Sequence, residues 1–203
     1  MQDHFGIPPQ TFQFLDPGPM IDGELELVAL QQKYVEAVLA AVRHPQTVRE
    51  APETGRISRQ SLIDFLALAP GGRHPGNAAT GRCPTYHFWM RLNDDSPLRI
   101  AGGIGLRIGD GETELRYTGH IGYNVYPPVR GRRLAERASR LLLPLARRHG
   151  LKSAWITCNP DNLASRKTAE RLGAVLVETV PVPVGHELYQ RGEREKCRFR
   201  IDL

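Results

Sequence analysis

The spacing of apolar residues predicts short strands and helices along the first third of the chain. Residues 24–28 alternate apolar and polar side chains, which is typical of a half-buried strand. Residues 33–42 and 59–68 each place their apolar side chains on one helical face, and the His-Pro pair at 44–45 should end the first helix. Residues 1–20 are interrupted by prolines, so we expect an irregular N-terminal arm there.

A loop rich in glycine and proline, residues 69–84, precedes three strand candidates. These candidates cover residues 86–92, 99–108 and 115–125, and their succession predicts an antiparallel meander. A loop this long inside a domain is usually functional or disordered. The segment before it is too small to hold a comfortable core of its own, so we expect residues 21–203 to form a single domain.

After residue 130 the apolar residues recur at helical spacing instead of alternating, which indicates a helix. Residues 131–149 predict a helix that ends at Gly150 and kinks at Pro144. A strand at 153–157 follows, so strand 115–125, this helix and the new strand form a βαβ unit with parallel strands and a right-handed crossover. The remaining predicted elements are a helix over 162–172 and strands over 175–180 and 197–203.

The predicted fold class is therefore α+β, a mixed α/β architecture. We expect a mostly antiparallel central sheet of about six or seven strands, with one parallel βαβ crossover and helices on both faces. No internal repeat or low-complexity segment interrupts this pattern.

Composition narrows the class of partner. The 203 residues include 27 Lys and Arg against 22 Asp and Glu, and this excess of positive charge favours nucleic acid or a phosphorylated ligand. The three cysteines are widely spaced and the seven histidines are scattered, so neither a disulfide framework nor a metal site is expected. We also expect no transmembrane helix, no secretory signal, no membrane partner and a cytoplasmic location.

The turn before the helix at 131–149 carries the candidate chemistry. Arg130, Arg132 and Arg133 surround a helix N-terminus, whose free N–H groups and dipole would suit a pyrophosphate. Gly131 would let a ligand approach the backbone. The alternative is an arginine-rich helix start exposed to solvent. Neither a Walker loop nor a glycine fingerprint between a strand and a helix occurs.

Two motifs in this region resemble those of the GNAT superfamily of acyl-CoA-dependent N-acyltransferases. The first looks like the coenzyme A signature of that superfamily and reads Val125-x-Pro127-x-x-Arg130-Gly131-x-x-Leu134-Ala135. The second reads Asn159-x-x-Asn162-x-x-Ser165-x-x-x-x-Glu170-x-Leu172-Gly173. The order of elements from residue 24 onward is similar to the whole GNAT domain, and residues 119–125 resemble bacterial predicted acetyltransferases.

The resemblance implies transfer of an acetyl group from acetyl-CoA to a primary amine by direct attack. The strands ending at 125 and 157 should splay apart and admit the pantetheine arm, while the pyrophosphate rests on the N–H groups of residues 130–135. One of the two asparagines of the second motif should also cap a helix. The residues that the resemblance assigns to acetyl-CoA are Asn124, Val125, Tyr126, Arg130, Gly131, Arg132, Arg133, Leu134, Ala135, Asn159, Asn162 and Ser165.

Two positions depart from the superfamily pattern. Arg133 stands where glycine is usual, and it either crowds the phosphates or turns outward and adds a cation. Ala169 stands where many members have a tyrosine that acts as general acid. The proton for the leaving sulfur would then come from Tyr123, Tyr126, Ser165 or water, and the sequence does not choose among them.

His120 is the sequence's candidate for the general base. Strand alternation would place it on one face with Gly122 and Asn124, and an imidazole is suited to proton transfer near neutral pH. The alternative is a histidine packed inside the sheet. We expect Cys158 to be a small buried residue without a catalytic role.

The acceptor amine is expected on a small molecule or a peptide, and the sequence does not identify it further. Its specificity is expected to lie in the irregular segments 43–58, 70–84 and 181–195. Two other functions stay open: a non-catalytic acyl-CoA-binding or regulatory module, favoured by Arg133 and Ala169, and a basic nucleic-acid-binding protein, which ranks last because no nucleic-acid motif occurs. Pairing of the C-terminal strand between subunits of a homodimer is expected by analogy only.

Overall fold

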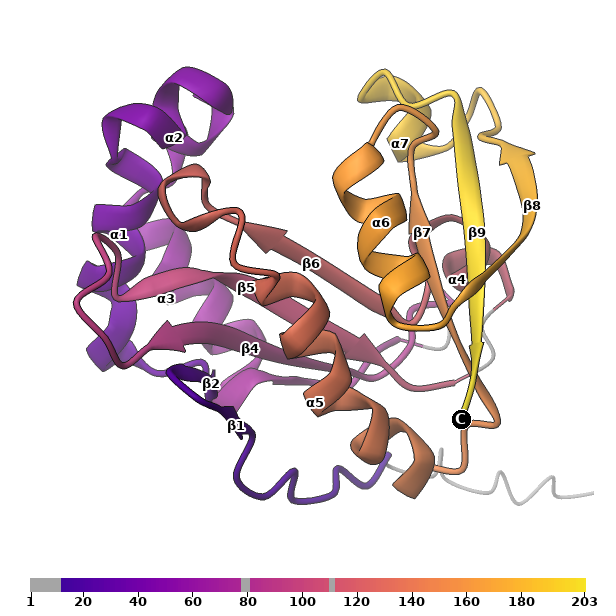
Figure 1. The fold of residues 1–203 in the computed structure, drawn as a ribbon, viewed down its shortest axis with the longest axis horizontal. Coiled ribbons are helices and arrows are strands. Elements are labelled where there is room, and N and C mark those ends of the chain that lie inside the picture. The colour runs from indigo at the N-terminus through magenta and orange to yellow at the C-terminus, as the bar shows by residue number, and fades with distance from the viewer. Residues whose placement is uncertain (1–11, 78–80, 110–111) are drawn as a thin grey trace, which may run out of the picture.

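Two β-sheets carry the fold, which we describe from a computed structural model covering residues 12–77, 81–109 and 112–203. The larger sheet has the strand order β1-β2-β4-β5-β6 with β3 paired to β4, and every recorded pairing in it is antiparallel. Figure 1 shows this sheet beside the smaller one. The strands are β1 (Ile21–Asp22), β2 (Leu25–Ala29), β3 (Arg73–His74), β4 (Thr85–Leu92), β5 (Ile100–Arg107) and β6 (Ile121–Val125).

The smaller sheet has the strand order β7-β9-β8 and is also antiparallel. Its strands are β7 (Ser153–Cys158), β8 (Val175–Pro181) and β9 (Glu195–Asp202). The prediction of one continuous sheet is therefore wrong in this respect, because β6 and β7 are the facing edge strands of two sheets. The predicted parallel pairing of β6 with β7 is not confirmed, since the described residues form no ladder between them.

Helices cover both faces of the larger sheet, as expected. Helix α5 packs on the face that carries the main apolar core, whereas α1 packs on the other face against Trp89 and Ile100. The helices are α1 (Val35–Arg43), α2 (Pro45–Glu50), α3 (Arg59–Leu68), α4 (Glu112–Thr118), α5 (Leu134–Arg148), α6 (Leu163–Arg171) and α7 (Glu187–Gln190).

Local capping explains several of these boundaries. Ser58 and Ser61 form a reciprocal capping box, with both hydroxyl-to-backbone bonds at 3.0 Å, so α3 spans the predicted range. The side chain of Asn162 accepts the Ser165 N–H at 3.0 Å and begins α6, which confirms that one asparagine of the second motif is a cap. His44 ends α1 before Pro45, as predicted.

The strand predicted over residues 115–125 is wrong in its first half. Helix α4 covers Glu112–Thr118, and only Ile121–Val125 forms β6. Gly119, with φ 67°, follows the helix, and a Cβ on it would lie 2.7 Å from the Trp155 carbonyl oxygen. The chain therefore reverses at a position that only glycine fits.

The N-terminal arm has no regular structure where it is described. Residues 1–11 of the predicted arm and 78–80 of the predicted loop lie outside the described residues. Residues 12–15 run against the main core, and the Tyr86 hydroxyl accepts the Leu15 N–H at 2.6 Å.

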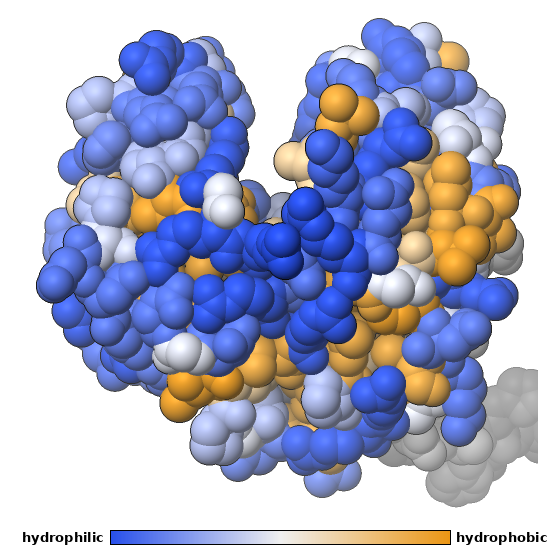
Figure 2. All heavy atoms as spheres, in the orientation of Figure 1, coloured by the Kyte–Doolittle hydropathy of each residue, from blue (hydrophilic) through white to orange (hydrophobic). Residues whose placement is uncertain are grey.

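The two sheets meet at the start of β6 and separate beyond it. The backbone N–H of His120 donates to the Trp155 carbonyl at 2.7 Å, and the Trp155 N–H donates to His120 Nδ1 at 3.0 Å. From this junction β6 runs to Val125 and β7 runs to Cys158, and both of these ends line the same opening. The space-filling view shows this opening as a deep cleft between two halves of the molecule (Figure 2).

Candidate functional site

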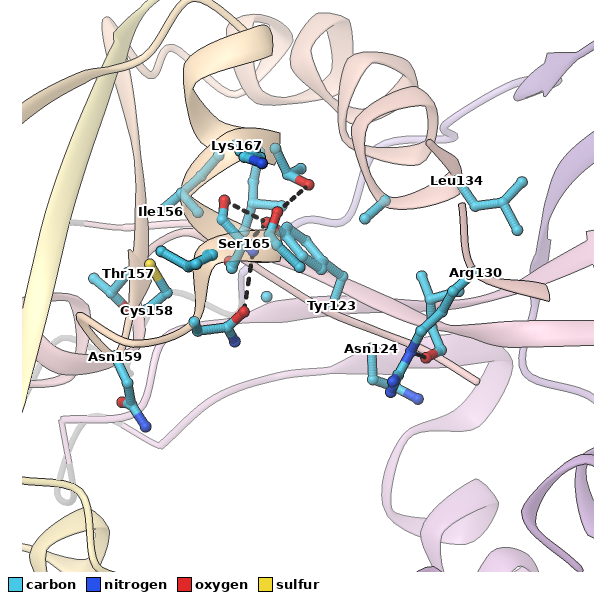
Figure 3. Close-up of a pocket in the computed structure, with 18 of the residues that line it drawn as sticks. Tyr123, Asn124, Arg130, Leu134, Ile156, Thr157, Cys158, Asn159, Ser165 and Lys167 are labelled. Atoms are coloured by element: carbon cyan, nitrogen blue, oxygen red, sulfur yellow. Dashed lines mark hydrogen bonds between the residues drawn. The ribbon is translucent and has the colours of Figure 1, made fainter. Parts of the chain in front are cut away.

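A cavity of about 1150 Å³, here called the first cavity, lies in the cleft between β6 and β7. Its walls are β6, the start of α5, the end of β7 and the first turns of α6, as Figure 3 shows. This volume is slightly larger than the usual range of about 300–1,000 Å³ for small-molecule sites. Ten of the sequence-predicted residues line it: Asn124, Val125, Arg130, Gly131, Arg133, Leu134, Ala135, Asn159, Asn162 and Ser165.

The backbones of β5 and β6 lie very close together next to the first cavity. Gly102 on β5 has φ 159°, and a Cβ there would lie 2.0 Å from the Asn124 carbonyl oxygen. Only glycine permits this close approach, so the β5 sequence shapes the cavity wall on β6. The Val125 carbonyl accepts the Arg130 Nε–H at 2.9 Å, which fixes the turn into α5.

The start of α5 turns its N-terminal end toward the first cavity. Gly131 has φ 86°, and Arg133, the helix N-cap, is left-handed with φ 54° and ψ 27°. No other non-glycine residue in the described part of the chain has a positive φ. The left-handed conformation at position 133 explains why glycine is usual there in the superfamily, because glycine adopts a positive φ without a steric cost. The first N–H groups of α5, at Leu134 and Ala135, border the cavity without intrahelical partners.

The three arginines of this turn have different roles. Arg130 lines the cavity and forms an ion pair with Glu50 at 2.8 Å. Arg133 also lines the cavity, and its exposed guanidinium has no ion pair among the described residues. Arg132 does not line it. The prediction that Arg132 binds the cofactor is therefore not supported by its position.

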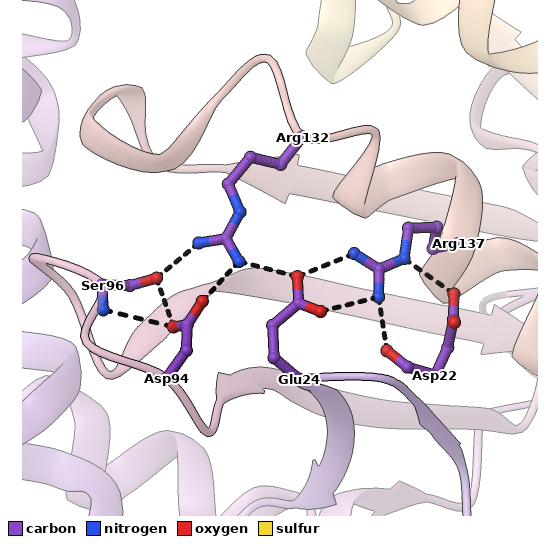
Figure 4. A network of polar contacts seen from close by, with 6 residues as sticks. All are labelled: Asp22, Glu24, Asp94, Ser96, Arg132 and Arg137. Atoms are coloured by element: carbon purple, nitrogen blue, oxygen red, sulfur yellow. Dashed lines mark hydrogen bonds and ion pairs between the residues drawn. The ribbon is translucent and has the colours of Figure 1, made fainter.

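Arg132 belongs instead to a network of ion pairs on the other side of the turn (Figure 4). Its guanidinium lies 2.6 Å from both Glu24 and Asp94, and Arg137 on α5 lies 2.9 Å from Glu24 and 2.7 Å from Asp22. The hydrogen bonds from Arg137 and Arg132 lower the pKa of Glu24 to about 2. The network ties α5 to the β1–β2 edge and holds the turn in place.

A tyrosine and a serine lie between β6 and α6 at the base of the first cavity. The Tyr123 hydroxyl is 2.9 Å from Ser165 Oγ, and Ser165 is held by the cap of α6. Burial raises the pKa of Tyr123, so its hydroxyl keeps its proton at neutral pH. The structure thus brings together two of the residues that the sequence offered as proton donors, whereas Ala169 is fully buried.

His120 does not line the first cavity, and its contacts do not support the prediction that it acts as general base. Its side chain is buried; Nδ1 accepts the Trp155 N–H, and Nε2 lies 3.1 Å from the Gly109 carbonyl. Accepting at Nδ1 requires the proton on Nε2, so neither nitrogen retains a free lone pair. Burial also lowers the pKa of His120. Its role is to join the two sheets.

Tyr126 lies beyond the first cavity, on the other face of the sheet. Its backbone N–H continues the β5 pairing by donating to Ala101 at 2.7 Å, and its ring lines a smaller second cavity. Its predicted contact with the cofactor is therefore not supported by its side-chain position. Cys158 is buried and burial raises its pKa, which agrees with the expectation of an unreactive thiol.

Two lysines that line the first cavity stand outside the residues predicted from the two motifs. Lys196 on β9 is buried, donates to Asn159 Oδ1 at 2.8 Å and pairs with Glu193. Lys167 reaches the cavity from α6. Lys167 could have been found from its position two residues after Ser165, but nothing in the sequence connects Lys196 to Asn159.

No group of three or more His, Cys, Asp or Glu side chains in the described part of the chain is arranged to hold a metal ion. No helix in the same residues is both long and apolar enough to cross a membrane.

Comparison with known proteins places these features in a family. A model of the acetyltransferase (GNAT) domain matches residues 24–175. No curated protein matches the sequence significantly.

Solved structures share the fold at low sequence identity. The microcin C7 self-immunity acetyltransferase MccE, in complex with acetyl-CoA and AMP, superimposes with a TM-score of 0.65 at 17% identity, over 90% of this chain and 94% of that one. A GNAT-family acetyltransferase from Bacillus anthracis gives 0.62 at 18% identity, over 91% and 98%. The ribosomal L7/L12 alpha-N-protein acetyltransferase RimL, in complex with coenzyme A, gives 0.59 at 18% identity, over 91% and 98%.

Proposed function

The chain belongs to the GNAT acetyltransferase family, and we propose that it transfers the acetyl group of acetyl-CoA to a primary amine. The observation that carries this proposal is the first cavity, which opens where the two sheets separate and collects ten of the twelve residues that the sequence resemblance assigned to the cofactor. Both sheets build this cavity, so we treat residues 21–203 as one catalytic domain.

Acetyl-CoA fits the charges along the first cavity. The pyrophosphate would lie on the N–H groups at the start of α5, where the helix dipole is positive and Arg133 offers a free guanidinium. The pantetheine arm would run between β6 and β7 toward Asn159, whose side chain is oriented by Lys196. This path brings the thioester to the region of Tyr123 and Ser165.

The reaction joins the amine nitrogen to the acetyl carbonyl carbon as the carbon–sulfur bond breaks. The sulfur leaves with the bonding electrons and takes a proton, giving free coenzyme A. Tyr123 supplies this proton, because its hydroxyl stays protonated and is hydrogen-bonded to Ser165. A thiol with a pKa near ~8.5 is a fair leaving group, so this donor contributes only part of the rate.

A binding measurement tests the proposal. Isothermal titration of acetyl-CoA should show one site with micromolar affinity. Ala135→Glu places a carboxylate beside the expected pyrophosphate and should weaken binding at least about tenfold through like-charge repulsion. The matched control is Ala40→Glu, the same substitution at an exposed position of α1 outside the cavity. Absence of binding by the unaltered protein would overturn the proposal.

A non-catalytic acyl-CoA-binding module is the second candidate. The buried Ala169 favours it, because this position cannot supply the proton donor found in many members. Binding of acetyl-CoA without turnover of any amine in a broad panel would favour this module over the enzyme.

A further inference from the structure

A second cavity of about 310 Å³ lies on the opposite face of β6 from the Tyr123–Ser165 pair. It is bounded by β4, β5 and β6 below and by α1 and α3 above. Gly122, Tyr123 and Asn124 line both cavities, so the two sites meet across one short stretch of strand. An acceptor in the second cavity would therefore face an acetyl group brought through the first.

Three glycines form part of the floor of the second cavity. The strand register aligns His87, Gly105 and Gly122 in one row, and Trp89, Gly103 and Asn124 in the next. Facing residues in a ladder point to the same side of the sheet. The three glycines therefore add no side chains of their own to this face, and the Asn124 amide, the His87 ring and the Arg107 guanidinium lie beside them. Without side chains from these glycines, a flat ring could lie against the strands.

The walls of the second cavity are apolar. Val38 and Leu62 cover it from α1 and α3, Phe65 stands at its rim, and Tyr126 closes one side. None of its lining residues, all of which are described, carries a carboxylate, a guanidinium or an ammonium group. The nearest cation is the Arg107 guanidinium, which lies beside Gly122 and donates to the Gly119 carbonyl. An alkylammonium would lose water in this cavity without gaining a counter-charge. Of the expected specificity segments, only residues 43–58 contribute, through Ile57.

His87 is the one titratable side chain of this cavity besides its two tyrosines. Its ring lies 5.4 Å from the Phe65 ring, and no described residue hydrogen-bonds to either ring nitrogen. Burial, with smaller contributions from Arg107 and His74, lowers its pKa to about 4. His87 is thus uncharged at neutral pH and has a lone pair available, which His120 lacks.

We infer that the second cavity is the acceptor site, that it takes a small aromatic primary amine, and that His87 accepts the amine's proton. The inference rests on the proposed acetyltransferase function. The cavity is at the lower end of the usual volume range, which is enough for one ring with a short substituent.

The chemistry of the step agrees with this choice. The nitrogen lone pair forms the C–N bond, the C–S electrons leave with sulfur, the nitrogen proton passes to His87, and Tyr123 protonates the thiolate. An aromatic amine is uncharged at neutral pH because its lone pair is delocalised into the ring, so it can attack at once. An alkylammonium, with a pKa near ~10, would not yield its proton to so weak a base as His87.

The acceptor panel separates this inference from the proposed function. Acetyl-CoA binding is first measured by titration, without any amine. Turnover is then followed with p-toluidine, 4-aminobenzoate, cyclohexylmethylamine, spermidine and a short peptide with a free α-amino group. We expect kcat/KM for p-toluidine to exceed that of cyclohexylmethylamine, spermidine and the peptide by about tenfold or more, with 4-aminobenzoate reporting the effect of one added carboxylate.

Variants then test the site itself. Phe65→Ala should raise KM for p-toluidine about tenfold, whereas Leu68→Ala, an exposed position on the same helix outside the cavity, should not. His87→Gln should lower kcat by about 10²-fold or more with little change in KM, and should remove the acid limb of the pH profile of kcat.

Two outcomes overturn the inference. The first is preferred turnover of spermidine or the peptide with no effect of Phe65→Ala, which would leave the proposed function standing. The second is a His87→Gln enzyme with unchanged kcat and pH profile. If acetyl-CoA binds but no amine in the panel is acetylated, it is the proposed function that fails.

Discussion

Replacing Arg133 by glycine should stabilise the protein while weakening acetyl-CoA binding. Arg133 adopts φ 54° and ψ 27°, a conformation in which a side chain crowds the backbone by about 1–2 kcal/mol. Glycine relieves this crowding but loses more freedom on folding, by about 0.5–1 kcal/mol. The net gain in the free energy of unfolding should be about 0.5–1 kcal/mol. For a chain of this size, that raises Tm by roughly 1–4 °C.

The effect on binding should have the opposite sign. The Arg133 guanidinium lines the first cavity without an ion pair among the described residues, so it is free to contact a phosphate. Losing one exposed charge-assisted contact of about 1 kcal/mol raises Kd roughly fivefold. The same substitution should reduce the salt dependence of binding, because one cation fewer is screened.

Two further variants at position 133 separate backbone strain from charge. Arg133→Ala keeps the strained conformation and removes the cation, so it should lose affinity without gaining stability. Arg133→Lys keeps both the strain and the charge, and both its Tm and its Kd should stay close to those of the unaltered protein. The assays are thermal unfolding and acetyl-CoA titration. A fall in Tm for Arg133→Gly, or equal Tm values for the glycine and alanine variants, would refute the strain argument.

Three other predictions concern groups placed by the structure. Tyr123→Phe should lower kcat about 10- to 100-fold with acetyl-CoA affinity unchanged, as measured by steady-state kinetics beside titration. Because the pKa of Glu24 is lowered, its ion pairs stabilise the fold above pH ~4.5, and this stabilisation is lost as the pH falls through about 2. Arg137→Ala should therefore lower the free energy of unfolding by about 1 kcal/mol at pH 7 but change it little at pH 2, as measured by urea unfolding. His120→Ala should lower the free energy of unfolding by about 2–3 kcal/mol, yet leave the pH profile of kcat unchanged in the folded fraction.

Where nearby side chains determine the position of an element, the sequence alone was enough to predict it. Helix α3 begins after Ser58 and ends at Leu68 as predicted, because its capping box and apolar stripe are both contained in the segment. The first cavity was also predictable, since its α5 and α6 walls each follow a compact motif. Both motifs fix backbone conformations within a few residues, so their geometry does not depend on distant partners.

His120 shows where pattern reasoning fails. Strand alternation would have put it on the face of Gly122 and Asn124, but β6 begins only at Ile121. The alternation does not extend to a residue in the turn that precedes the strand. The contact that decides its role, Trp155, lies 35 positions later and belongs to the other sheet.

The misread helix α4 has a similar cause. Leu115 and Tyr117 are both buried, as in an alternating strand. Tyr117, however, is buried in a small cluster with Val180, Val182 and Leu188, which come from the far end of the chain. A short helix with two buried residues at this spacing therefore resembles a strand in the sequence pattern.

The position of β6 explains why transfer should occur there. As the edge strand of the larger sheet, it is free of a partner where β7 turns away, so its last residues can be reached from the cleft and from the opposite face. Alternation then gives its two faces different chemistry. Tyr123 presents a hydroxyl to Ser165, whereas Gly122 presents no side chain to the second cavity. A methyl group added at Gly122 would fall within 3.4 Å of the Arg107 guanidinium and would lie over the glycine floor, so Gly122→Ala should impair acceptor use more than acetyl-CoA binding.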